Sequence, residues 1–257
     1  MIQITPTVKQ LLIINVLFYI GSQIVGPPAY DLLSMYYPEN PKFHFWQIFT
    51  HMFMHAPPPN YMHIVFNMFA LYSFGSALEQ FWGGKKFLFF YISCGLGSAL
   101  LYNLFNFWEI HQGIQEMMKA NIPHSDIVNF MTKGQTVGKY SQEILGSISM
   151  EKVQNMAIAY NGQMLGASGA IYGLLVAFGF MFPNAEMFLM FIPIPIKAKY
   201  LISGVLILDL VLGLYGSSFF GPGGTGVAHF AHLGGALIGF LMMWYWKKNQ
   251  FNGKRWN

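Results

Sequence analysis

Six stretches of mostly apolar residues recur along this 257-residue chain. A transmembrane helix needs about 20 predominantly apolar residues, and several of these stretches reach that length. Between the third and fourth stretches the chain turns polar but keeps helix-like segments such as Met150 to Tyr160. The pattern predicts a single all-α membrane domain over residues 1–257, a bundle of six transmembrane helices with an extramembrane helical insertion. The predicted spans are about 8–26, 61–82, 86–108, 165–182, 199–216 and 227–246, with the insertion at about 109–163.

The composition supports a membrane location. Hydrophobic residues make up 54% of the chain and charged residues only 9%, whereas a soluble domain carries about 25% charged residues. The net charge of +4 is therefore better explained by membrane topology than by nucleic-acid binding, and we expect no nucleic-acid partner. Cys94 is the single cysteine, which excludes an internal disulfide and a cysteine-based metal site.

The basic residues predict an orientation. In a six-span arrangement one side collects nine of them, and basic residues favour the cytoplasmic side. We expect cytoplasmic termini, with the 27–60 loop and the insertion outside. The first span, which lacks a clear cleavage site, is expected to be retained. Trp244, Tyr245 and Trp246 are expected in an interfacial aromatic belt. The nine basic residues are Lys9, Lys85, Lys86, Lys197, Lys199, Lys247, Lys248, Lys254 and Arg255.

Polar residues occur near the outer ends of the second, fourth and sixth spans. The second span carries His63 and Asn67, whose spacing of four residues puts them on one helical face. The fourth span begins with Ser168 between glycine-rich neighbours, and the sixth carries His232. Polar groups inside a membrane are costly, so each of these residues is a candidate for a functional site.

Counting residues places these groups at one depth. Ser168 lies 15 residues before Pro183, and His232 lies 15 residues before Lys247. At about 1.5 Å per residue, both are roughly 22 Å above the inner ends of their helices. Asn67 lies 16 residues before the end of its own span and is level with them. The count predicts that the three helices bring these side chains together.

Glycines indicate which of these helices touch. Gly169 and Gly173 form a small-xxx-small face on the fourth span, and Gly235 and Gly239 form one on the sixth. Such faces let two helix backbones approach closely in lipid. Close packing would bring the histidine within hydrogen-bond reach of the serine, where an imidazole can take the hydroxyl proton and create a nucleophile.

Three neighbouring residues could support that chemistry. Tyr172, one turn below Ser168, could pack against the His232 ring and hold it. A developing oxyanion could be stabilised by the Ser168 N–H at the start of a helix and by the side chains of Asn67 and His63. Because hydrolysis needs water, we also expect a hydrated cavity at the outer end of the bundle.

At this point the chain resembles the rhomboid intramembrane serine proteases, in particular the bacterial type with a six-transmembrane core. The resemblance covers the first outer loop and spans two to six, and its motifs follow the family's order. The motifs are Trp46 to His55, His63-x-x-x-Asn67, Gly75 with Leu78 and Glu79, Gly166-Ala-Ser168-Gly169, and Ala231-His232-x-x-Gly235-x-x-x-Gly239.

The resemblance implies a role for each of these residues. Ser168 would be the nucleophile, His232 the general base, and His63 and Asn67 oxyanion donors. The implied reaction is hydrolysis of peptide bonds in or near transmembrane segments of other membrane proteins, without a cofactor or metal. The implied location is the bacterial inner membrane, with the active site opening to the outer side.

The chain departs from the family pattern in three places. Gln47 occupies a position where the family has arginine, which questions any arginine-dependent anchoring of the first outer loop. The loop from Ala56 to Asn60 is longer and stiffer than in the bacterial enzymes, and the 109–163 insertion is atypical. None of these departures affects the proposed dyad.

Two other functions are alternatives. A catalytically silent relative that binds membrane clients would share the fold but lack the serine or the histidine, and both are present. A membrane metal enzyme is suggested by His51-x-x-x-His55 and His229-x-x-His232. The lack of nearby carboxylate ligands and of a His-Glu-x-x-His helix argues against it. We expect His51 and His55 to be structural and His229 to be interfacial or to line a cavity.

Two acidic residues lie inside predicted spans. Asp209, in the middle of span five, is counted several residues deeper than the dyad and is expected to be structural or hydrated rather than a third catalytic member. Glu79, near the inner end of span two, is expected to be structural. The glycine-rich loop 216–226 is predicted to gate the site, with Phe219 and Phe220 as its plug. A simple flexible connection is the alternative for this loop.

Overall fold

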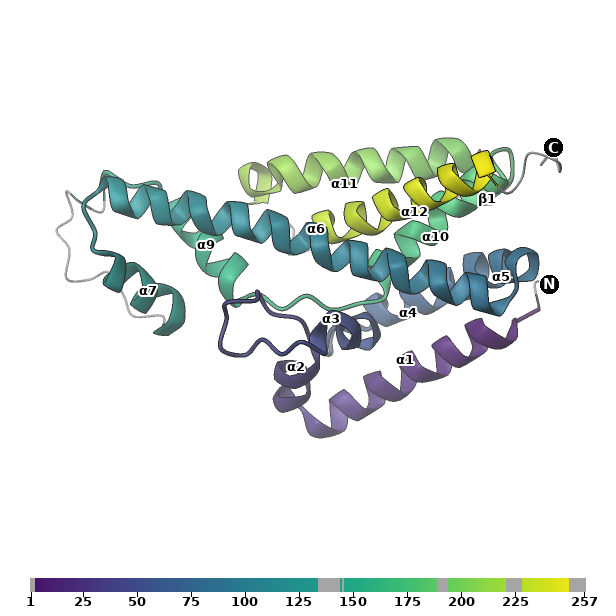
Figure 1. The fold of residues 1–257 in the computed structure, drawn as a ribbon, viewed down its shortest axis with the longest axis horizontal. Helices are drawn as coiled ribbons and strands as arrows, with labels where there is room; N and C mark the ends of the chain where they lie inside the picture. Colours follow the sequence, from purple (N-terminus) through teal and green to yellow (C-terminus); the bar gives the residue numbers. More distant parts are fainter. Residues whose placement is uncertain (1–2, 134–143, 145, 189–193, 221–227, 250–257) are drawn as a thin grey trace.

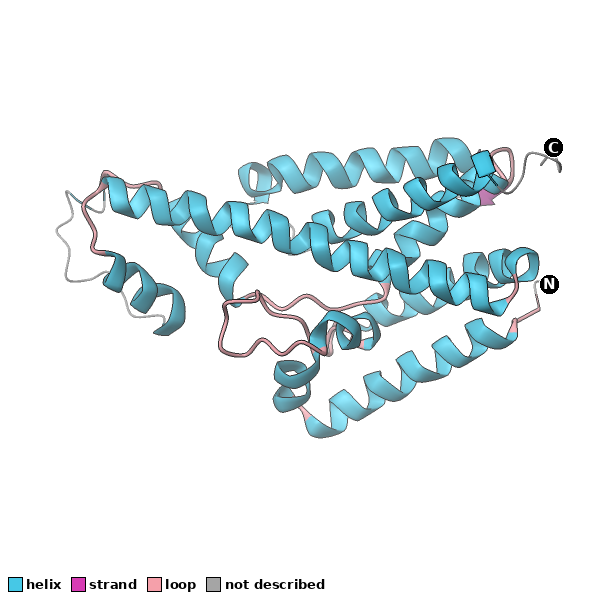
Figure 2. Cartoon of the chain, viewed as in Figure 1, coloured by secondary structure: helices cyan, strands magenta, loops and turns pink. Residues whose placement is uncertain are grey.

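A computed structural model describes residues 3–133, 144, 146–188, 194–220 and 228–249. The described chain is a set of helices with one short two-stranded hairpin (Figures 1 and 2). The helices are α1 (Pro6–Val25), α2 (Pro27–Leu33), α3 (Gln47–Thr50), η1 (His51–Phe53), α4 (Tyr61–Ala70), η2 (Leu71–Gly75), α5 (Ser76–Trp82), α6 (Gly84–Lys119), α7 (His124–Lys133), α9 (Met150–Asn161), α10 (Ser168–Met181), α11 (Ala198–Phe220) and α12 (His229–Asn249). The hairpin pairs β1 (Glu186–Phe188) with β2 (Pro195–Lys197) in antiparallel register.

Each predicted span corresponds to a helix or to a continuous helical run. Within the described residues, three helices are long and apolar enough to cross a membrane, namely Pro6–Val25, Gly84–Lys119 and Ala198–Tyr215, and Ser168–Met181 is a shorter apolar helix. The second span is helical throughout, but the π-helical turn η2 divides it into α4 and α5. The predicted class, an all-α membrane bundle, is confirmed.

The helix that contains the third span extends past the predicted end of that span. The span was expected to end at about residue 108, and α6 continues without a break to Lys119, into the stretch predicted as the insertion. The reason is that apolar residues keep a helical period beyond the membrane segment, and buried Ile110 and Met117 pack with Val153 and Met156 of α9. The described part of the insertion is mainly helical, as predicted, and α9 coincides with the stretch expected to form a helix.

The two ends of the bundle differ in what they carry. The start of α1, the turn between α5 and α6, the β hairpin and the end of α12 lie at one end, and the insertion helices α7 and α9 lie at the other (Figure 1). The segments that carry the predicted inner-side lysines are therefore grouped together, away from the insertion.

The glycine faces of the fourth and sixth spans meet as predicted, with α6 packed against both. A Cβ atom added to Gly239 would lie 2.8 Å from the Cα atom of Gly173. On the α6 side, a Cβ atom added to Gly173 would lie 2.3 Å from the sulfur of Cys94. Only glycine fits at these contacts, so these small residues are what allows α6, α10 and α12 to lie this close.

Gln47 anchors the first outer loop. Its side chain is fully buried, and its Oε1 accepts from the backbone N–H groups of Tyr36 (3.3 Å) and His44 (3.2 Å). Its Nε2 donates to the carbonyl oxygens of Asp31 (3.0 Å) and Lys42 (2.9 Å). A neutral amide thus satisfies four backbone groups at the position where the resembled family has arginine, and no charge is needed for this anchoring.

Glu79 caps the first helix from a distance in sequence. Its carboxylate accepts hydrogen bonds from the backbone N–H groups of Thr7 (2.9 Å) and Val8 (2.9 Å) and from the Thr5 hydroxyl. The first N–H groups of a helix have no partner within the helix, and a negative charge there is favourable. This contact agrees with the structural role predicted for Glu79.

Candidate active site

Ser168 and His232 lie side by side at the starts of two helices. Ser168 is the first residue of α10, and His232 is in the first turn of α12. The Nε2 atom of His232 is 3.0 Å from the Oγ atom of Ser168, a normal hydrogen-bond distance. Both residues are mostly buried but keep some exposed surface, which for the His232 side chain is 12%. The structure therefore brings together the two residues that the depth count predicts to meet.

The glycine contacts explain why this approach is possible. A Cβ atom on Gly169 would lie 2.0 Å from the Ser98 hydroxyl of α6, and one on Gly235 would lie 1.8 Å from the Gly169 carbonyl oxygen. Both glycines are next to, or one turn from, the reactive pair. A larger side chain at Gly235 would push α12 away from α10 and separate the serine from the histidine, and one at Gly169 would push α10 away from α6.

Tyr172 packs against the histidine as predicted. Its ring is stacked on the imidazole of His232, with 4.2 Å between ring centroids and an interplanar angle of 12°. Tyr172 follows Ser168 by one turn on α10, so a single helix presents both the hydroxyl and the surface that holds the imidazole plane.

His63 faces the same space as the serine. Its Nδ1 atom accepts a hydrogen bond from the Ala56 N–H at 3.1 Å, which assigns the ring proton to Nε2. A Cβ atom built on Gly166 would lie 2.9 Å from this Nε2 and 3.4 Å from the Ser168 Oγ. The small volume beside Gly166 is therefore bordered by the hydroxyl and by an N–H donor.

Gly166 is needed for its backbone as well as for this space. Its φ of +123° is one that L-residues with side chains rarely adopt. Its N–H donates to the His51 carbonyl oxygen at 2.9 Å, which ties the start of α10 to the first outer loop. The glycine thus keeps the volume beside Ser168 open and fixes the turn that leads into α10.

Asn67 is close to this site but is not joined to the serine. It is buried one turn below His63, and its Nδ2 donates to the His63 carbonyl oxygen at 2.7 Å. Its Oδ1 has no hydrogen-bond partner within the described residues. The amide keeps a second N–H, so Asn67 remains a predicted donor without a contact to Ser168 in this structure.

The predicted depth of Asp209 was wrong. Its carboxylate lies against the dyad histidine, with the Nδ1 atom of His232 at 3.5 Å from Oδ1 and 3.4 Å from Oδ2. His229 is hydrogen-bonded to the same carboxylate through its own Nδ1. Counting along a helix gives the height of each residue relative to the ends of that helix, but not the height at which side chains of two neighbouring helices meet. The sequence did contain one signal for this contact, since a carboxylate inside a membrane span needs a partner.

Asp209 also changes the case against a metal centre. Asp209, His229 and His232 each offer a ligand atom, and these atoms lie within 4.8 Å of one another. The expectation that no carboxylate accompanies the His229 and His232 pair was therefore wrong. Within the described residues this is the single group of three potential ligands, and neither His51 nor His55 belongs to it.

His51 and His55 are buried in and after η1, where the first outer loop packs. The Nδ1 atom of His51 lies 2.8 Å from the Gln47 carbonyl oxygen, and the His55 ring is 5.2 Å from that of His63. Burial lowers the pKa of His51 to about 4 and that of His55 to about 3. Both imidazoles are therefore neutral at pH 7, which agrees with structural roles.

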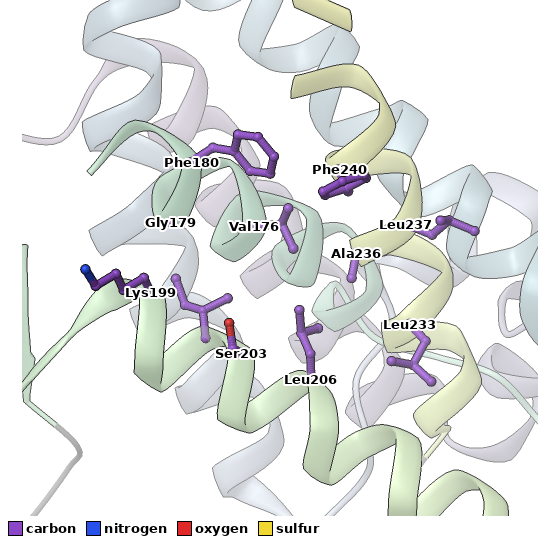
Figure 3. Close-up of a pocket in the computed structure, with 11 residues that line it drawn as sticks. Val176, Gly179, Phe180, Lys199, Ser203, Leu206, Leu233, Ala236, Leu237 and Phe240 are labelled. Atoms are coloured by element: carbon purple, nitrogen blue, oxygen red, sulfur yellow. The ribbon is translucent and has the colours of Figure 1, made fainter. Parts of the chain in front are cut away.

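An apolar cavity of about 450 Å³ lies away from the dyad, between α10, α11 and α12. Figure 3 shows Val176, Leu206 and Phe240 among the side chains that line it, with Lys199 and Ser203 as the polar ones. None of the dyad residues lines this cavity, so it is not the hydrated cavity expected beside Ser168. The predicted gating loop 216–226 is partly helical, because α11 continues to Phe220, and residues 221–227 with the side chains of Phe219 and Phe220 lie outside what the structure describes.

Comparison with known proteins agrees with the motifs. A family model described as the rhomboid domain matches residues 42–118 and 138–249. Rhomboid protein 1, mitochondrial, of Saccharomyces cerevisiae is 26% identical over 188 residues, covering 73% of this chain and 39% of the yeast protein. The presenilin-associated rhomboid-like protein, mitochondrial, of Mus musculus is 28% identical over 168 residues, covering 63% of this chain and 43% of the mouse protein.

An uncharacterized mitochondrial rhomboid protein of Schizosaccharomyces pombe is 27% identical over 225 residues, covering 79% of this chain and 52% of its own length. The chain thus spans about half, or less, of the length of these relatives. All three are mitochondrial proteins, so the expected bacterial origin finds no counterpart among them. Because the rhomboid domain match extends over more than half of the chain, this multi-pass membrane protein belongs to the rhomboid family.

Proposed function

We propose that this protein is an intramembrane serine endopeptidase that cleaves peptide bonds in or near transmembrane segments of other membrane proteins. The observation that carries the proposal is the 3.0 Å contact between the Ser168 Oγ and the His232 Nε2. A hydroxyl and an imidazole in hydrogen-bond contact, reachable from outside the protein and set among apolar helices, form the basic unit of nucleophilic acyl transfer.

The reaction begins when Ser168 attacks the carbonyl carbon of the scissile bond. As the Oγ–C bond forms, the hydroxyl proton passes to the Nε2 of His232, which acts as general base. The tetrahedral intermediate then breaks the C–N bond, and the same proton passes to the leaving amine. A water molecule, deprotonated by His232, hydrolyses the resulting acyl-enzyme and restores the serine.

The developing oxyanion needs donors that are already in place. We assign this role to the Ser168 backbone N–H at the start of α10, to the Nε2–H of His63 and to the free amide N–H of Asn67. His63 has the stronger structural support, because its ring borders the same volume as the Ser168 Oγ beside Gly166. Asn67 would have to reach the oxyanion after substrate has entered.

A silent, client-binding role is less well supported. A family member that had lost catalysis would have no need to keep the serine and the histidine in hydrogen-bond contact, nor to stack Tyr172 on the imidazole at 4.2 Å. A metal-dependent role has the Asp209, His229 and His232 group in its favour. That group includes His232, whose Nε2 is already in contact with Ser168, so the same histidine serves the serine chemistry without a metal.

The proposal includes an orientation. We assign the basic segments at one end of the bundle to the cytoplasmic side of a bacterial inner membrane, or to the equivalent side of a mitochondrial membrane, because the relatives are named as mitochondrial proteins. The dyad, at the outer ends of α10 and α12, would then open to the opposite side. This orientation can be tested with cysteines introduced in α9 and after β2. A membrane-impermeant reagent added from one side should label only the cysteine that faces that side.

Fluorophosphonate labelling of the purified protein tests the function. The expected result is labelling that persists with a metal chelator and disappears in Ser168→Ala and His232→Ala. Ser203→Ala is the matched control, because Ser203 is a serine on a membrane helix that lines the separate apolar cavity. Absence of labelling in the unmodified protein would overturn the protease proposal, and loss of labelling with chelator would favour the metal-dependent alternative.

A further inference from the structure

We propose that Asp209 is a positioning residue for His232, so that the dyad works as part of a Ser168, His232 and Asp209 arrangement. This inference rests on the proposed function, because it assigns to Asp209 a task in the reaction of Ser168. It also replaces the expectation that Asp209 is only a structural or hydrated group.

The first argument is the direction of the two ring nitrogens of His232. The Nε2 faces the Ser168 Oγ at 3.0 Å, and the Nδ1 faces the Asp209 carboxylate at 3.4 to 3.5 Å. An ionised carboxylate can only accept a hydrogen bond, and a neutral imidazole carries one N–H. The carboxylate therefore favours the proton on Nδ1, which leaves the Nε2 lone pair free to take the serine proton.

The second argument is burial. Asp209 is only 5% exposed and sits on α11 beside Leu208 and Leu210, which face outward. A carboxylate inside a membrane bundle is costly unless it is paired. Its described ion-pair and hydrogen-bond partners are the two histidines of α12, and the Tyr172 hydroxyl also interacts with it. The buried charge is therefore paired with His229 and lies within 3.5 Å of the imidazole of the dyad.

His229 supplies the third argument, because it holds the carboxylate from the other side. Its Nδ1 is hydrogen-bonded to the Oδ1 of Asp209, and its side chain is buried. The Oδ2 makes no hydrogen bond of normal geometry within the described residues and lies 3.4 Å from His232. Catalytic hydrogen bonds are often long before substrate binds, so a small movement of His232 would complete this one.

The proposed task can be followed through the reaction. When the Ser168 proton moves to Nε2, the ring of His232 carries protons on both nitrogens and becomes positively charged. Asp209 keeps its negative charge, accepts the Nδ1–H and stabilises the imidazolium, but takes no proton itself. The Nε2 proton then leaves with the amine product, and the ring returns to the same Nδ1–H form.

The Asp209→Asn variant tests this task. An amide can donate to Nδ1 and so favour the ring form with the proton on Nε2, which cannot accept the serine proton. In serine proteases with a buried aspartate this exchange lowers kcat by about 10⁴-fold. The contact between Asp209 and His232 is longer than a normal hydrogen bond, and the carboxylate is shared with His229. We therefore expect kcat to fall about 10²-fold, with KM changed less than about threefold. Asp209→Glu should recover at least tenfold of the loss. Asp31→Asn, which removes a carboxylate from the outer loop, is the matched control and should leave kcat unchanged.

A second measurement needs no change at Asp209. The ¹⁵N shifts of the His232 ring in a Ser168→Ala protein report which nitrogen carries the proton, and the expected result is Nδ1. A proton on Nε2, or an Asp209→Asn kcat within threefold of the unmodified value, would overturn the positioning role. If the unmodified protein is not labelled by fluorophosphonate, the proposed function fails, whatever the ring form of His232.

Discussion

A Cβ atom on Gly235 would lie 1.8 Å from the carbonyl oxygen of Gly169. This is a contact between two helix backbones, so no side chain can rotate away to make room. The pair sets the distance between α10 and α12, and with it the distance between Ser168 and His232.

Gly235→Ala should therefore reduce both stability and labelling. Overpacking of a well-packed core costs about 1–3 kcal/mol, and here the backbone itself must move. We expect the thermal midpoint in detergent to fall and fluorophosphonate labelling to drop at least tenfold. Gly204→Ala is the control, because a Cβ atom there meets nothing within 4 Å on α11. Equal behaviour of the two variants would show that the α10 and α12 contact does not limit the dyad.

Gly166→Ala should affect activity more than folding. The residue has a φ of +123°, and a Cβ atom would lie 2.9 Å from the His63 Nε2, in the volume assigned to the oxyanion. A backbone strain of this kind costs about 1–3 kcal/mol. We expect kcat to fall at least about tenfold while the protein remains folded by circular dichroism. Gly21→Ala, where a Cβ atom meets nothing within 4 Å, is the control. Full activity of Gly166→Ala would contradict the oxyanion assignment.

The sequence predicts most of this site because its signals are local and periodic. Ser168 and His232 could be paired from residue counts along two helices that run in the same direction, and the glycine spacing predicts their contact. Tyr172 follows from the position one turn below the serine. These inferences need only the helical repeat and the rule that small residues mark close helix contacts.

The parts that the sequence did not predict depend on contacts between segments far apart in the chain. Asp209 was counted too deep because the count gives heights along each helix separately, and not where its carboxylate meets the imidazole of His232 across α11 and α12. Gln47 was seen only as a missing arginine, since its four backbone partners come from loop residues without a periodic pattern. The continuation of α6 to Lys119 depends on its contact with α9, far along the chain.

Glu79→Gln should weaken the attachment of α1. The carboxylate accepts hydrogen bonds from Thr7 and Val8 at the start of that helix. Hydrogen bonds to charged groups contribute about 1.5–3 kcal/mol, and the amide can still accept part of them. We expect a loss of about 1–2 kcal/mol in unfolding experiments, with labelling of the folded protein retained. The control is Glu186→Gln on the exposed edge of the hairpin, and an equal effect of both would remove the capping explanation.

The buried His51 should make the protein less stable in mild acid. Burial lowers its pKa in the folded state to about 4, from an unfolded value near 6.5, so between these values the unfolded chain binds more protons. Its contribution is fully present above pH 6.5 and is lost as the pH falls toward 4, by up to about 3 kcal/mol.

The measurement is the thermal midpoint of unfolding between pH 7.5 and pH 4.5. His51→Asn can keep a donor to the Gln47 carbonyl oxygen but cannot titrate, so its midpoint should fall less steeply with acid than that of the unmodified protein. His55, whose pKa burial also lowers, should leave part of the slope in this variant. His124→Asn, at an exposed position at the start of α7, is the matched control and should keep the original slope. If His51→Asn also keeps that slope, the burial of His51 is not what makes the protein sensitive to acid.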